Sequence, residues 1–119
     1  MTDTTPPPLP LPVLIMVRDL LFSSRITATA KSANIPFKVI RDPAKLAGEP
    51  GDRLIVDLNQ PQTIPAAADW RKQSGRPVIG FVSHVDADTI AQAKAAGLDK
   101  VMARSQFVQQ LESLLAEKL

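Results

Sequence analysis

Five short, continuous runs of apolar residues constrain the fold of this chain more than any other feature. The segments between them place apolar residues at helical spacing, so strands and helices are predicted to alternate along the chain. The predicted strands span residues 13–17, 37–40, 54–56, 77–82 and 100–103. The predicted helices span residues 20–34, a short segment from Asp42 to Gly48, residues 65–74 and 86–96, and a last helix capped by Ser105.

The apolar runs do not alternate with polar residues, which indicates that both faces of the sheet are covered. This pattern is typical of a parallel sheet between two layers of helices. Right-handed crossovers leave few topologies for five parallel strands. We therefore predict an α/β fold of the flavodoxin-like type, a three-layer sandwich with a five-stranded parallel sheet in the order 2-1-3-4-5.

The chain divides into a short tail and one domain. Five of the seven residues from Pro6 to Pro12 are proline, so residues 1–12 are predicted to form a flexible, extended tail. Two interpretations of the tail remain open: a solvated leader, or a ligand for an aromatic-lined groove on another protein. Residues 13–119 are predicted to form the folded domain.

Composition excludes several classes of site. The chain of 119 residues has no cysteine and one histidine, which excludes disulfides, zinc–thiolate sites and histidine-cluster metal sites. Its net charge of +2 is too small to indicate nucleic-acid binding. We see neither a secretory leader nor an apolar run of the roughly 20 residues that a membrane span needs, and we expect a cytoplasmic protein with no membrane partner.

Polar residues follow several predicted strands at the point where each strand ends. Arg18 and Asp19 follow the first strand, Asp57 the third, Ser83 and His84 the fourth, and Arg104 the fifth. Because the carboxyl ends of parallel strands meet at one edge of the sheet, these side chains are expected to share one rim. The alternative is that strand ends are polar simply because they reach solvent.

These positions resemble the active site of response-regulator receiver (CheY-like) domains. The segment from Asp57 through Asn59 to Pro61 is similar to the family's phosphoacceptor turn, and Ser83 stands where the family has threonine or serine. Residues 96–104 match in length the family's alanine–glycine turn, fifth strand and terminal lysine. The resemblance extends over residues 13–119 and implies that Asp57 is equivalent to the phosphoacceptor, with Arg18, Asp19, Asn59, Ser83, His84 and Arg104 around it.

The sequence departs from the family at the positions that support phosphorylation. Receivers carry an acidic pair after the first strand to hold magnesium, whereas here Arg18 replaces one of the two acids. If magnesium binds, its carboxylate ligands are Asp19 and Asp57, and the Arg18 cation opposes it. Arg104 replaces the family's lysine, and Val101 replaces the aromatic switch residue. An ion pair of Asp57 with Arg18 or Arg104 is the expected substitute for metal and phosphate.

The leading hypothesis is a stand-alone, atypical receiver domain that is not an enzyme and needs no cofactor. It would act as a phosphorylation-independent protein-interaction module in bacterial signal transduction. Its partner would be a signalling kinase or an output protein. A homodimer is expected to use the face formed by residues 86–96, the fifth strand and the last helix.

Two other functions remain open. The first is a working phosphoacceptor regulator, with Asp57 phosphorylated and magnesium bound. The second is a flavodoxin-like binder of a small ligand or nucleotide, although the loop after the first strand lacks the glycines of a phosphate cradle. Two residues carry lesser alternatives: His84 is a surface histidine or a pH-sensing group, and Trp70 covers the core or contacts a partner.

Overall fold

One parallel sheet forms the centre of the protein. The computed structural model describes residues 10–83 and 86–117, and in this part of the chain five strands pair in the order β2-β1-β3-β4-β5. The strands are β1 (Val13–Met16), β2 (Phe37–Val39), β3 (Arg53–Asp57), β4 (Val78–Val82) and β5 (Lys100–Ala103). The predicted strand order is therefore confirmed.

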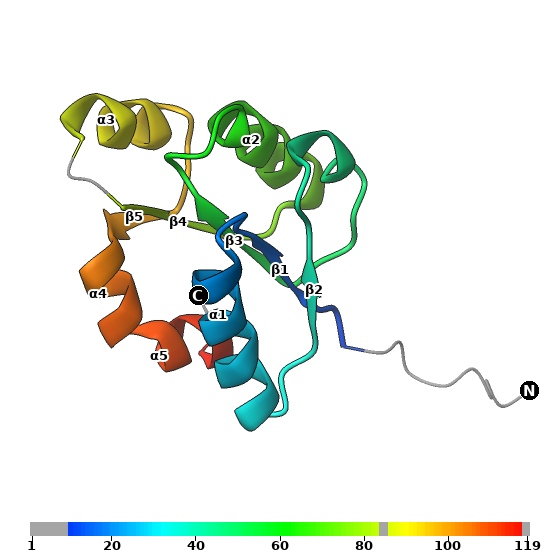
Figure 1. The fold of residues 1–119 in the computed structure, drawn as a ribbon. Coiled ribbons are helices and arrows are strands. Elements are labelled where there is room, and N and C mark those ends of the chain that lie inside the picture. Colours follow the sequence, from blue (N-terminus) through cyan, green and yellow to red (C-terminus); the bar gives the residue numbers. More distant parts are fainter. Residues whose placement is uncertain (1–9, 84–85, 118–119) are drawn as a thin grey trace, which may run out of the picture.

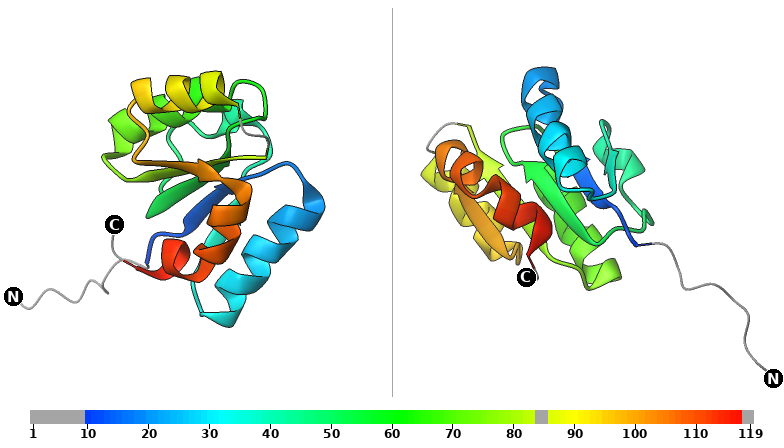
Figure 2. Two further views of the ribbon diagram at one scale, coloured as in Figure 1. Left: turned by 90° about the vertical axis from the view of Figure 1, so that its left-hand side faces the viewer. Right: turned by 90° about the horizontal axis from the view of Figure 1, so that it is seen from below.

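Helices cover both faces of this sheet, so the domain has three layers (Figures 1 and 2). The helices are α1 (Leu20–Ser32), the short 3₁₀ helix η1 (Pro43–Lys45), α2 (Thr63–Ser74), α3 (Ala87–Ala95), α4 (Arg104–Gln109) and α5 (Leu111–Ala116). Figure 1 shows α1, α4 and α5 beneath the sheet and α2 and α3 above it. The predicted α/β sandwich is confirmed.

Alternate residues of each strand enter two separate hydrophobic clusters. In β1, Val13 and Ile15 pack with α1, α4 and α5, whereas Leu14 and Met16 pack with α2 and α3. The same alternation holds in β3, where Ile55 belongs to the first cluster and its neighbours on either side to the second. The side chains on both faces of β1 and β3 are therefore removed from water, which explains the continuous apolar runs in the sequence.

Local capping sets several helix ends close to where the sequence predicts them. The Asp19 carboxylate accepts a hydrogen bond from the Phe22 amide at 3.1 Å and begins α1, and the Asp86 carboxylate begins α3. Asn34 follows α1 with φ +57°, and Gly75 ends α2 with φ +70°. These left-handed residues turn the chain back toward the next strand.

Several predicted boundaries are wrong. The last helix is not capped by Ser105: α4 begins at Arg104, Ala103 is its N-cap without a side-chain hydrogen bond, and Gln110 separates α4 from α5. The helix predicted from Asp42 to Gly48 is only the three-residue η1. The third strand includes Arg53 and Asp57, because ladder pairing to β1 and β4 extends beyond the apolar residues.

Trp70 belongs to the core. It is 2% exposed, and its indole nitrogen donates a hydrogen bond to the Glu49 carbonyl at 2.9 Å. The predicted covering role is confirmed. The indole joins α2 to the loop that precedes β3, so both its apolar ring and its polar N–H are used.

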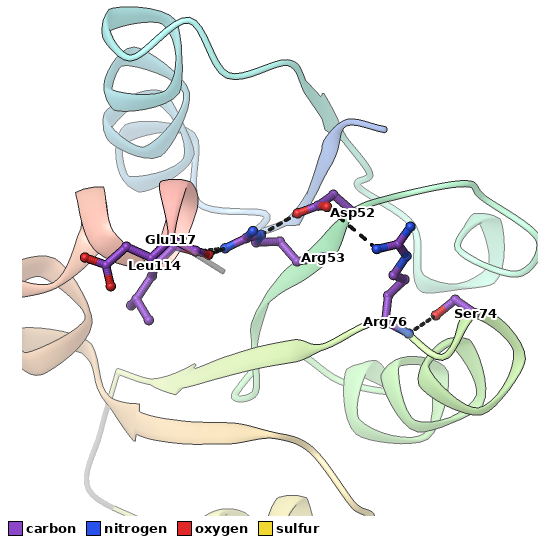
Figure 3. Close-up of polar contacts among 6 residues, drawn as sticks. All are labelled: Asp52, Arg53, Ser74, Arg76, Leu114 and Glu117. Carbon is purple, nitrogen blue, oxygen red and sulfur yellow. Dashed lines mark hydrogen bonds and ion pairs between the residues drawn. The ribbon is translucent and has the colours of Figure 1, made fainter. Parts of the chain in front are cut away.

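A buried arginine joins the sheet to the C-terminal helix (Figure 3). The side chain of Arg53 is 8% exposed. Its Nη1 donates to the carbonyls of Leu114 and Glu117 at 2.8 and 2.7 Å, and its Nε donates to Asp52 at 2.7 Å. Carbonyls at a helix C-terminus lack intrahelical donors, so Arg53 satisfies groups that α5 leaves unpaired.

Parts of the predicted tail and rim lie outside the described residues or at their edge. Residues 1–9 of the predicted tail and His84 lie outside the described residues. Pro12, the last residue of that tail, accepts a hydrogen bond from the Asp52 amide at 2.8 Å. Among the helices described, none has both the length and the hydropathy to cross a bilayer.

Replacing Arg53 with alanine is expected to lower the free energy of unfolding by about 2–4 kcal/mol, because carbonyl groups of α5 lose a charged donor and the core loses the arginine stem. Urea denaturation measures this loss. Arg76→Ala is the matched control, since Arg76 lies 3.9 Å from the same Asp52 carboxylate but is 47% exposed; its cost is expected to stay below about 1 kcal/mol. Equal costs for the two variants would contradict the role given to Arg53.

Candidate functional site

Asp57 is the last residue of β3 and lies at the carboxyl end of the sheet. Its side chain is partly buried, and its Oδ1 accepts a hydrogen bond from the Asn59 amide at 3.0 Å. The Leu58 amide still bonds to the Phe81 carbonyl at 2.9 Å, so the backbone on either side of the carboxylate is held by the sheet. The position of Asp57 is therefore set by β3 and β4 together.

The turn after Asp57 is tightly bonded within itself. The Thr63 hydroxyl, which is fully buried, donates toward the carbonyls of Asp57 and Gln60 at 2.9 and 2.8 Å. Gln62 has φ +68°, a left-handed conformation that is uncommon outside glycine. This turn thus connects Asp57 to the start of α2 through side-chain contacts as well as through the chain.

Burial is the main influence on the Asp57 carboxyl group. Desolvation raises its pKa above the ordinary value of 3.8. The hydrogen bond from Asn59 and the positive charge of Arg104 act in the opposite direction, and the negative charge of Asp19 raises the pKa further. The burial effect exceeds the attraction of Arg104, so the ionised carboxylate is less stable here than in water.

Arg104, at the junction of β5 and α4, extends to the start of α1 and not to Asp57. Its guanidinium lies 3.8 Å from the centroid of the Phe22 ring and 3.8 Å from Asp19 Oδ2. The planar guanidinium is suited to stacking on an aromatic ring while it attracts a carboxylate at its edge. One three-residue contact of Arg104, Phe22 and Asp19 therefore joins the start of α1, after β1, to the junction of β5 and α4.

Three phenylalanine rings pack together at this contact, and one of them is the Phe22 ring itself. Phe22, Phe81 and Phe107 have centroids 4.8–5.8 Å apart, and each is almost completely buried. They come from α1, β4 and α4, so the cluster joins three elements that converge on the rim. Edge-to-face and offset ring contacts of this kind add to the stability that burial provides.

The predicted ion pair of Asp57 is wrong in this structure. In the described part of the chain Arg104 pairs with Asp19 instead, and no ion pair of Arg18 or Asp57 is found. Arg18 is exposed. The physical reason is that the Phe22 ring, 3.8 Å from the guanidinium, gives Arg104 a second contact beside Asp19 at the start of α1.

Asn59 and Ser83 are brought together across the rim. The Ser83 amide donates to Asn59 Oδ1 at 2.5 Å, which joins the turn after β3 to the end of β4. Together with Asp57, these residues lie where the sequence predicts the site. His84, the next residue, falls outside the described residues, so its predicted place on the rim stays a prediction.

The residues of the rim do not fit a magnesium centre. Within residues 10–83 and 86–117, no group of three or more His, Cys, Asp or Glu side chains could hold a metal ion. Asp19 uses one oxygen to cap α1 and the other to face Arg104, and Arg18 precedes it. Magnesium requires near-octahedral oxygen coordination, and the two rim carboxylates, one of which faces Arg104, provide too few ligands for it.

Two residues of the site are not evident from the sequence. Along the chain Phe22 is only an apolar residue at helical spacing, because its contact with Arg104 joins residues 82 positions apart. Thr63 lies in the turn after Asp57. The signal available for Thr63 was its place six residues after Asp57, immediately before apolar helical residues; Phe22 had no comparable signal.

Solved structures share this fold at low sequence identity. A phosphorylated cyanobacterial phytochrome response regulator, RcpA, is 16% identical with a TM-score of 0.73, over 89% of this chain and 91% of that one. A CheY-like receiver domain protein from Methanospirillum hungatei is 13% identical (TM-score 0.74; 92% and 96% covered), and the chemotaxis protein CheY4 of Vibrio cholerae is 18% identical (TM-score 0.70; 90% and 100% covered). No family model and no curated protein matches the sequence.

Asp57→Asn is expected to stabilise the protein at pH 7 by no more than about 1 kcal/mol. Because the folded-state pKa of Asp57 is raised, the folded protein binds this proton more tightly than the unfolded chain does. The aspartate form therefore loses stability as the pH rises from below 3.8 through the raised pKa, and asparagine avoids that loss. Chemical denaturation at pH 3 and pH 7 measures the effect.

The gain from Asp57→Asn is expected to be larger at pH 7 than at pH 3. Asp69→Asn, at an exposed position of α2, is the matched control for removing one carboxylate. A gain that is the same at both pH values would show that desolvation of the ionised Asp57 is not its cause.

Proposed function

We propose that the protein is an atypical receiver-like domain that acts as a phosphorylation-independent protein-interaction module in bacterial signal transduction, in the cytoplasm. The observation that carries this proposal is the contact of Arg104 with Asp19 and Phe22, at 3.8 Å in each case. Asp19 is one of the two carboxylates that would bind a divalent ion, and in this contact it is paired with the Arg104 cation instead. The fold, shared with receiver domains, supplies the general class.

Phosphoryl transfer to an aspartate depends on a metal ion that neutralises charge on the transferred group. Here the positive charges at the rim belong to Arg18 and Arg104, which are permanently charged. Arg104 offsets part of the negative charge of Asp19 and Asp57 without any metal or phosphate. Such a rim would keep a single arrangement, which a partner would recognise whether or not a kinase is active.

The residue that would couple phosphorylation to the surface is also different. Val101, partly buried in β5, packs against the core cluster on the α2 and α3 side. It has no ring that moves between an exposed and a buried position. We therefore propose that the signal is the binding of the partner protein itself, and that the side chain of Val101 does not switch between rotamers.

The proposed partner is a protein, either a signalling kinase or an output protein. For self-association we propose the face formed by α3, β5 and the last helix, which the structure divides into α4 and α5. Its exposed side chains include Gln92, Lys94, Lys100 and Gln106, a polar and weakly basic surface that fits a reversible contact more than an obligate one.

A second candidate function is a phosphoacceptor regulator in which Asp57 accepts the phosphoryl group. The observation in its favour is the position of Asp57 at the end of β3, partly exposed, with Ser83 held nearby through Asn59. The two candidates make opposite predictions for a phosphoryl analogue.

Addition of magnesium and beryllofluoride is expected to leave the backbone amide resonances of residues 57–63 and 83 unchanged, because Asp19 and Asp57 do not provide a suitable metal site. Two-dimensional NMR of the labelled protein makes the measurement. Saturable shifts in these residues would replace the leading proposal with the phosphoacceptor function.

Arg18→Asp is expected to increase the affinity for magnesium by about tenfold, since it replaces a fixed cation with a carboxylate next to Asp19. Magnesium titration followed by amide shifts near Asp57 measures the gain. Arg25→Asp, at an exposed position further along α1, makes the same change of charge away from the rim and is expected to have a smaller effect. Equal gains in the two variants would show that Arg18 does not control metal binding at the rim.

A further inference from the structure

A cavity of about 370 Å³ lies outside the edge strand β2 and the helix η1. Residues 38–42 line it together with Lys45 and Glu49. Arg41 and Asp42 follow the carboxyl end of β2, so the cavity begins at the same end of the sheet as Asp57 but on the edge strand. Its volume is within the range of small-molecule sites.

The acidic side chains of the cavity already have partners within its wall. Glu49 forms an ion pair with Lys38 at 2.9 Å, and the Asp42 carboxylate accepts a hydrogen bond from the Ala44 amide at 3.0 Å, which caps η1. Arg41 and Lys45 line the same cavity, are exposed, and make no ion pair with the described residues. The charge left without a partner in the cavity is therefore positive.

The backbone that carries these two cations is held in place. The side-chain amide of Gln60, which is 8% exposed, donates to the Arg41 carbonyl at 3.4 Å. The Lys45 amide donates to the Asp42 carbonyl at 2.9 Å. A fixed backbone lowers the entropy lost when the two side chains close on a ligand.

The inner wall of the cavity is apolar. Val39, the last residue of β2, and Ile40 are among its lining residues; Val39 is partly buried and Ile40 is almost completely buried. Cations beside an apolar wall suit a molecule that has an anionic group and an apolar or planar part.

We propose that this cavity binds a small organic anion, with Arg41 and Lys45 as the residues that hold the anionic group and with the apolar residues at the end of β2 as part of its wall. The site is separate from the rim around Asp57, and its occupancy does not depend on the function proposed for that rim. Arg41 provides a planar donor fork for a phosphate or carboxylate, and Lys45 provides a second positive charge.

The test is an NMR titration of the labelled full chain with adenosine monophosphate, which combines one phosphate with one planar ring. Saturable shifts centred on residues 38–45 are expected. Adenosine and inorganic phosphate, titrated separately, are each expected to bind more weakly, because each lacks one of the two contacts. Equal affinity for inorganic phosphate would overturn the organic anion as the ligand.

Arg41→Gln and Lys45→Gln are each expected to weaken the binding of adenosine monophosphate about fivefold or more. Arg25→Gln, at an exposed arginine on α1 outside the cavity, is the matched control and is expected to leave it unchanged. Shifts that do not saturate, shifts centred on Arg18 and Arg104, or an equal loss in the control variant would overturn the proposal. The titration of the unaltered protein decides the location even if a variant folds poorly.

Discussion

The rest of this structure depends on the burial of both faces of a five-stranded parallel sheet. Neighbouring residues of β1, β3 and β4 enter different hydrophobic clusters, so helices must cover each face. Crossovers of one hand then bring every strand into the sheet in the same direction. This brings Asp19, Asp57, Ser83 and Arg104 to one end of the sheet, although they are spread over most of the sequence.

At that end of the sheet, the chemistry of the site depends on which carboxylate, Asp19 or Asp57, pairs with Arg104. A guanidinium near two carboxylates has a choice of partners, and the Phe22 ring favours Asp19 over Asp57. Asp57 is left with a backbone hydrogen bond from Asn59 and with a burial penalty on its charge. The rim therefore has a cation held near α1 and a partly buried carboxylate whose pKa is raised. This electrostatic arrangement differs from one organised around a divalent ion.

The sequence predicts the architecture well and the contacts poorly. Strand order, the position of Asp57 and the helix ends near Asn34 and Gly75 depend on local patterns and on the handedness of crossovers, both of which can be read along the chain. The partner of Arg104 and the buried hydrogen bonds of Arg53 depend on side chains distant in sequence, and Arg53 has no local pattern that marks it as buried. The division of the last helix at Gln110 likewise has no proline or glycine to signal it.

The contact between Arg53 and α5 uses only main-chain oxygens of the helix. Every amino acid carries the same carbonyl, so an exchange of side chain at Glu117 leaves the bond intact, whereas an exchange at position 53 removes it. Evolutionary drift along the outer surface of the last helix can thus proceed without loss of its attachment, while the first residue of β3 stays under constraint.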